Sequence, residues 1–172
     1  GRFGGLGGFE ELDEVVFPTA HNSMSAADLD GWLFPNQEQG TVALLDRGIR
    51  GFLFDVHYGT PIGDRIKTDI QDEVASRAKF EAAIGTEAVE AAMRIRARLT
   101  GTPTGPRAAY LCHAFCEIGA TPLEPMLQGV RDFLIAHPGE VLIFVIEDYV
   151  TPGDIEAAFR QSGLEQYVYR GP

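Results

Sequence analysis

Ionisable and amide side chains stand at the ends of four apolar segments of this sequence. A strand that only has to stop can do so with Gly, Pro or Asp, so an imidazole beside a carboxamide at such a point indicates a binding mouth. Two histidines with two carboxylates and an amide supply a general base, a general acid and oxygen ligands for a hard cation. These side chains are His21, Asn22 and Ser23 after the first segment, Asp55 and His57 in the second, His113 in the third, and Glu147 and Asp148 in the fourth.

The four segments read as strands that alternate with helices. Alternation along the second segment places Leu53, Asp55 and His57 on one face, so that Asp55 can point inward with His57 beside it. The fourth segment shows no alternation, which is typical of a strand buried on both faces. We expect strands at 15–19, 48–59, 107–115 and 141–149, and helices at 37–47, 76–99, 122–136 and 154–161.

Strand and helix in alternation predict right-handed crossovers and a parallel sheet with helices outside. The carboxyl ends of parallel strands lie on one face of such a fold, where the polar side chains would meet. Four units are half of an eight-stranded barrel, which takes about 250 residues. We therefore expect one α/β domain over residues 1–172 with a largely helical insertion at 60–105, either an open four-stranded sheet or the first half of a parallel TIM-type barrel.

Four motifs in order resemble the X-region of the phosphatidylinositol-specific phospholipase C superfamily: "FPTAHNSMS", "RGIRGFLFDVHYG", "LCHAFCEIGATPLEPML" and "EVLIFVIEDY". The resemblance covers roughly residues 14 to 170, apart from the insertion. It implies a TIM-type barrel that cleaves phosphodiesters by attack of a neighbouring substrate hydroxyl on phosphorus. It also implies that His21 is the general base and His113 the general acid, and that Asn22, Asp55 and Glu147 are metal ligands, with Ca²⁺ the expected cation.

Three positions depart from that family pattern. The calcium-dependent branch has another acidic ligand where this sequence has Leu53. The metal-independent branch has an arginine where this sequence has His57 and an aspartate where it has Asn22. We favour a divalent cation, because Asn22 and Glu147 are both present. His57, Ser23 and Asp148 are candidate substrate contacts.

The expected substrate is a phosphoinositide or related phospholipid, with transient contact to a membrane surface. Two alternatives stay open at this point: a non-catalytic X-domain that binds a lipid headgroup or acts as a scaffold, and a glycerophosphodiesterase-like or sphingomyelinase-D-like enzyme of the same fold. A secreted or membrane-associated extracellular location is favoured.

Composition limits the partners. The chain has 25 Asp and Glu against 14 Lys and Arg, a formal net charge of −11, which repels nucleic acid and anionic surfaces at long range. The charged stretch in 60–105 is expected to be a solvated helical insertion rather than a binding segment. The pair Cys112 and Cys116 is read as either a small disulfide loop or two reduced thiols.

Overall fold

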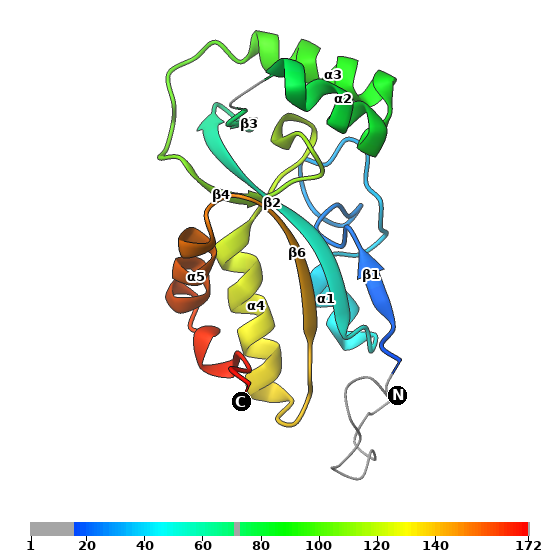
Figure 1. Ribbon diagram of the computed structural model, residues 1–172, viewed down its shortest axis with the longest axis vertical. Coiled ribbons are helices and arrows are strands. Elements are labelled where there is room, and N and C mark those ends of the chain that lie inside the picture. The colour runs from blue at the N-terminus through cyan, green and yellow to red at the C-terminus, as the bar shows by residue number, and fades with distance from the viewer. Residues whose placement is uncertain (1–15, 71–72, 172) are drawn as a thin grey trace.

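One long strand organises the sheet of this protein, for which a computed structural model describes residues 16–70 and 73–171 (Figure 1). This strand, β2 (Gly51–Ile62), is 12 residues long and rich in the bulky apolar residues that favour extended backbone. The strands β1 (Thr19–His21) and β6 (Ile143–Tyr149) both run parallel to its first half. They flank it on opposite edges, because Gly51 pairs with a residue of each. Residue 15, where the first strand was expected to begin, lies outside the described residues.

The far half of β2 carries antiparallel partners. The strand β3 (Arg65–Thr68) forms a hairpin with it, and β4 (Ala108–Leu111) pairs on the opposite edge, since Gly59 is bonded to both. A two-residue strand, β5 (Thr121–Pro122), pairs antiparallel with β4. The six-stranded sheet is therefore mixed.

The expectation of four parallel strands is wrong at the third strand. The chain returns to the sheet beside the far end of β2, where the Thr104 amide donates to the Pro61 carbonyl at 2.9 Å. From that end it can only run back along β2, so β4 is antiparallel. The parallel part of the sheet is β1, β2 and β6, and a half-barrel of four parallel strands is not what this structure shows.

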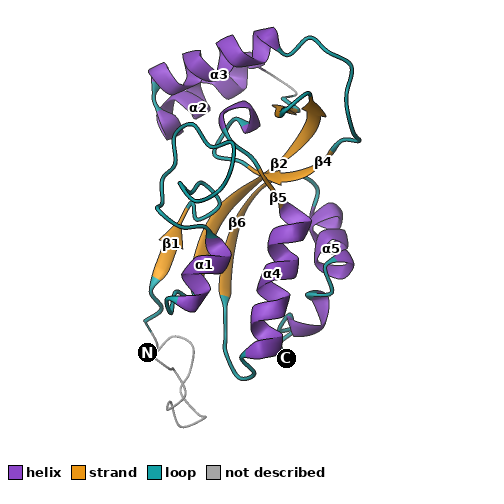
Figure 2. Ribbon diagram, turned by 180° about the vertical axis from the view of Figure 1, so that it is seen from behind, coloured by secondary structure: helices purple, strands orange, loops and turns teal. Residues whose placement is uncertain are grey.

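Helices α1 (Thr41–Asp46), α4 (Leu123–Ala136) and α5 (Pro152–Gln161) lie along one face of the sheet (Figure 2). The structure confirms the two expected C-terminal helices, and Thr151 caps α5 by accepting from the Asp154 amide. The first helix begins only at Thr41, later than expected.

The insertion forms a helix pair instead of one helix. Helix α2 (Glu73–Ile84) and helix α3 (Thr86–Arg98) are separated by Gly85, whose φ of 84° ends the first of them. The pair lies at the top of Figure 1, at the end of the sheet where β3 pairs with the second half of β2.

Two apolar clusters hold these layers together. The larger joins Phe52, Phe54 and Val56 of β2 to α4 and α5. The smaller joins Phe80 of α2 and Val89 of α3 to the loop after β4. None of the described helices combines the length and apolar character that a bilayer crossing requires.

The fourth expected strand, β6, is covered on one face only. Phe144 and Ile146 pack on the larger cluster, whereas Ile143 is 37% exposed and Val145 is 50% exposed. The expectation that this strand is buried on both faces is therefore wrong. Its helices, α4 and α5, cover only the side where Phe144 and Ile146 point.

Candidate active site

A cleft of about 380 Å³ opens near the carboxyl ends of β1 and β6, beside Asp55 in the first half of β2. It brings together two histidines and two carboxylates that come from four separate segments of the chain. The described residues that line it are His21, Asp55, Lys79, Phe80, Ala82, Ala83, His113, Ala114, Glu147 and Tyr149.

The register of the parallel strands places the two carboxylates side by side. Asp55 of β2 is the cross-strand neighbour of Glu147 of β6, and His21 ends β1 beside Leu53. Burial and, after it, the negative charge of Glu147 raise the pKa of the Asp55 carboxyl to about 6, against the opposing effect of the Lys79 ammonium. Two adjacent carboxylates in one cleft create a local demand for positive charge.

His113 reaches the cleft from a loop. Strand β4 ends at Leu111, so the expectation of His113 within a strand is wrong by two residues. Ala114 takes a φ of 66°, which turns the chain directly after the histidine. The Nε2 atom of His113 lies 3.3 Å from Nδ2, the side-chain amide nitrogen of Asn22. Burial and the nearby His21 lower the pKa of His113, while Glu147 acts in the opposite direction.

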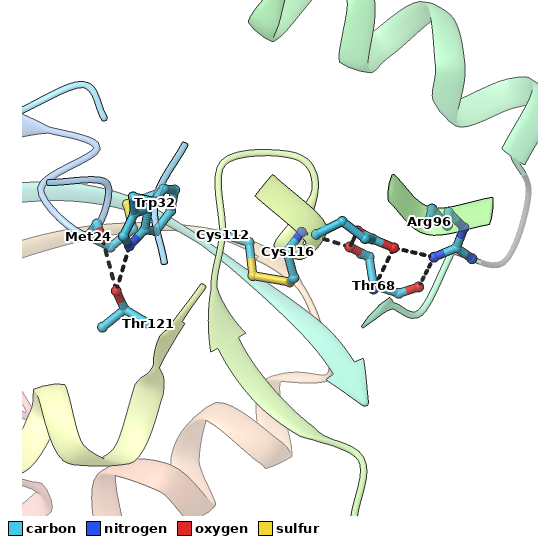
Figure 3. The surroundings of a disulfide bond; sticks show 8 residues. Met24, Trp32, Thr68, Arg96, Cys112, Cys116 and Thr121 are labelled. Carbon is cyan, nitrogen blue, oxygen red and sulfur yellow. Dashed lines mark hydrogen bonds and ion pairs between the residues drawn. A yellow bond between two sulfur atoms is a disulfide. The ribbon is translucent and has the colours of Figure 1, made fainter. Parts of the chain in front are cut away.

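The loop that carries His113 is closed by a disulfide between Cys112 and Cys116 (Figure 3). The backbone amide of Cys116 donates to the hydroxyl of Thr68 on β3 at 2.8 Å. The fully buried Glu117 then accepts from Thr68 and forms an ion pair with Arg96 of α3 at 2.6 Å. The disulfide thus closes the loop on itself, while hydrogen bonds fix the loop to the hairpin and an ion pair fixes it to α3.

His57 lies behind the cleft and does not line it. Its ring stacks on Tyr149 with centroids 4.2 Å apart and planes 7° from parallel. Burial lowers the pKa of His57 to about 4, helped by the positive charges of Lys79 and His113. His57 is therefore a neutral ring at pH 7, and within the described structure its Nε2 atom has no hydrogen-bond partner.

Three other predicted site residues, Ser23, Asp148 and Asn22, do not line the cleft. Ser23 is buried, with its hydroxyl 2.7 Å from that of Thr41 at the start of α1. Asp148 is exposed and points to the opposite face of β6 from Glu147. Asn22 is buried beside His113, and its Oδ1 atom finds no partner among the described residues.

A comparison with protein-family models finds one match: the model described as PI-PLC X 1 covers residues 86–172. The chain belongs to this family. The matched residues include His113 and Glu147, while His21, Asn22 and Asp55 precede the match but line or adjoin the same cleft. No curated protein and no solved structure matches the chain.

Helix α2 supplies lining residues that reasoning from the sequence missed in this PI-PLC X domain. Lys79, Phe80, Ala82 and Ala83 line the cleft. Lys79, Ala82 and Ala83 are exposed, as expected for a solvated insertion, and a binding role for the insertion stays a prediction. The position of α2 depends on the contact of Phe80 with Phe115, whose ring centroids are 4.6 Å apart. No local pattern encodes that long-range contact.

The cleft and its border hold oxygen atoms of the hard type that Ca²⁺ and Mg²⁺ bind. Asp55 and Glu147 contribute adjacent carboxylates, and the Oδ1 atom of Asn22 is buried without a partner in the described structure. Among the described residues, no three His, Cys, Asp or Glu side chains lie together so that they could hold a metal ion.

Proposed function

We propose that this PI-PLC X domain is a phosphodiesterase that cleaves a phosphoinositide or related phospholipid by intramolecular attack of a substrate hydroxyl on phosphorus. The observation that supports this proposal is the shared cleft of His21, His113, Asp55 and Glu147. We further propose that β1, β2 and β6 belong to a barrel of the TIM type, and that residues 1–172 act as one domain with the helix pair as an insertion.

In the proposed reaction, His21 removes the proton of a substrate hydroxyl next to the phosphodiester. The resulting oxygen attacks phosphorus and forms a new P–O bond, while the bond to the leaving diacylglycerol oxygen breaks. His113 gives its proton to that oxygen. The products are a cyclic phosphodiester and a neutral alcohol. His21 has gained one proton and His113 has lost one.

The electrostatics of the cleft support a pair that carries one proton. Because His21 lowers the pKa of His113, two positive imidazoles together are disfavoured. An anionic phosphodiester beside His113 favours the charged imidazole, so substrate binding would prepare His113 as the acid. Glu147 acts in the same direction.

We propose that Asn22, Asp55 and Glu147 would hold a divalent cation, with Ca²⁺ the best fit to their hard oxygen atoms. Such an ion supplies neutralisation of phosphoryl charge. The proposal is checked by calorimetric titration of the protein with Ca²⁺. Measurable binding that Asp55→Asn abolishes is the expected result, and absence of binding would remove the ion from this proposal.

The surroundings of the cleft support a lipid substrate. Leu33 and Phe34, in the loop that follows β1, are 43% and 53% exposed, and this loop begins at the strand end that carries His21. Adjacent exposed apolar side chains favour transient contact with a membrane surface. The buried disulfide favours a secreted or membrane-associated extracellular location, because such bonds persist in oxidising compartments.

The decisive experiment measures turnover of a soluble inositol phosphodiester. His21→Gln and His113→Gln should each lower turnover by roughly 10²- to 10⁴-fold, and a cyclic phosphodiester should be detected as the product. His137→Gln is the matched control, because His137 ends α4 and bonds to the Phe133 carbonyl away from the cleft. Binding of the substrate without turnover would contradict an enzyme and favour a headgroup-binding module.

A further inference from the structure

Lys79 of helix α2 lines the cleft and packs on the aromatic ring of Tyr149. Its Nζ atom lies 4.2 Å from the centroid of the Tyr149 ring, within the range of a cation–π contact. His57 stacks on the same ring at 4.2 Å. Both partners lie at contact distance from the ring centre, so they occupy opposite faces of Tyr149. The lysine, the tyrosine and the buried histidine form a three-layer stack.

The ring of Tyr149, which serves as a platform for Lys79, is itself fixed. The Tyr149 hydroxyl donates to Glu147 at 3.0 Å, and the ring is supported from behind by His57, which is only 4% exposed. The four-carbon stem of a lysine is flexible, whereas its tyrosine platform cannot easily move. The ammonium is therefore kept near the cleft and stays free to shift toward an arriving ligand.

Charge at the cleft makes this ammonium important. Lys79 is the single Lys or Arg among the described residues that line the cleft, where Glu147 and Asp55 both attract it. A phosphodiester carries a negative charge and would meet these two carboxylates on entry. A positive charge in the cleft is therefore needed to offset the repulsion between the phosphodiester and the two carboxylates.

We propose that Lys79 is the residue that binds the phosphoryl oxygens of a phosphodiester in this cleft. The assignment rests on the proposed function for its substrate class. The ammonium leaves the Tyr149 face or tilts from it, and donates to the non-bridging phosphoryl oxygens. The helix pair inserted after β3 thus supplies the site with a cation of its own.

Binding is tested without turnover, by following the imidazole proton signals of the histidines in NMR titrations. Inorganic phosphate and a soluble inositol phosphodiester whose attacking hydroxyl is methylated, and which therefore cannot be cleaved, serve as separate probes. They distinguish a site for any phosphate from one for diesters. Lys79→Met should weaken binding of the diester by about tenfold, the loss expected for one charge-assisted contact. Lys79→Arg should restore most of it.

Arg77→Met is the matched control, because Arg77 lies on the same helix, is paired with Glu81 and does not line the cleft. It changes the net charge equally and should leave the affinity within about twofold, as expected for an exposed pair. Equal affinity of Lys79→Met and the wild-type protein, or no binding by the wild-type protein, would overturn the proposal. Lys79-dependent binding without turnover would instead sustain it while the proposed enzymatic activity failed.

Discussion

At the scale of single residues, the fold holds ionisable side chains at and behind the cleft in surroundings that disfavour their charged forms. Asp55 is next to another carboxylate, and His57 is buried as a neutral ring with an unpartnered nitrogen in the described structure. Functional sites are often strained in this way, and substitutions there can stabilise a protein that loses its activity.

Asp55→Asn should stabilise the protein at neutral pH. The carboxyl ionises near pH 3.8 when unfolded and near pH 6 when folded, so its ionisation opposes folding above that window. The variant should gain about 1 to 2 kcal/mol at pH 7, after allowance for solvent screening of a half-buried group. Urea unfolding at pH 7 and pH 4 checks this. A gain that is equally large at pH 4 would contradict the electrostatic cause.

His57→Phe should remove a loss of stability in acid. The unfolded imidazole takes up a proton near pH 6.5 and the folded one only near pH 4, so the wild-type protein loses stability as the pH falls through that window. Between pH 7 and pH 5 the variant should gain about 2 kcal/mol relative to the wild-type protein, while its ring still stacks on Tyr149. Unfolding curves at the two pH values measure this difference, and parallel pH profiles would disprove it.

At the scale of elements, the loop between β4 and β5 joins the sheet to the helix pair α2 and α3 beside the cleft. It carries His113, is closed by the disulfide, and binds β3 and α3 through Glu117. The same loop packs on Phe80 of α2, so the helix pair and the second histidine are positioned together.

Replacement of both cysteines by alanine should therefore affect stability and activity together. Loss of a cross-link between residues four apart should lower the free energy of unfolding by about 2 kcal/mol on the chain-entropy model. Turnover should fall by more than the loss of folded protein explains, because the loop that positions His113 is released. Urea unfolding and steady-state kinetics on the same samples separate the two effects. Unchanged kinetics would show that Glu117 and Thr68 alone hold the loop in place.

At the scale of the whole molecule, the net charge of −11 determines which lipid surfaces the domain can approach. Long-range repulsion slows approach to an anionic vesicle, and salt weakens this repulsion by shortening the Debye length. The exposed Leu33 and Phe34 act only at contact, so they do not replace long-range attraction.

Turnover on anionic phosphoinositide vesicles should consequently rise as salt is raised from about 10 mM to about 150 mM, which shortens the Debye length from about 30 Å to about 8 Å. A soluble phosphodiester measured in parallel reports the effect of salt on the cleft itself. A fall in vesicle turnover over this range would mean that a local basic surface, and not the net charge, controls approach.

Local sequence patterns predicted several parts of this protein correctly. Capping and periodicity gave the extents of α4 and α5, and apolar runs located β2 and β6. Because β1 and β6 run parallel to β2, their register brings His21 and Glu147 beside the part of β2 that carries Asp55. These features depend on residues near one another in the chain and on the regular geometry of strands.

Other features depend on contacts between distant segments, which no local pattern encodes. The direction of β4 follows from the end of β2 at which the chain returns, and the fourth strand is exposed because helices cover only one face. The place of α2 over the cleft follows from its packing on the loop after β4. The amino-acid sequence by itself determined which ionisable groups the parallel strands β1, β2 and β6 carry. Only the tertiary structure decided that His57 stacks behind Tyr149 and that Lys79 joins the cleft, because packing of distant elements sets those neighbours.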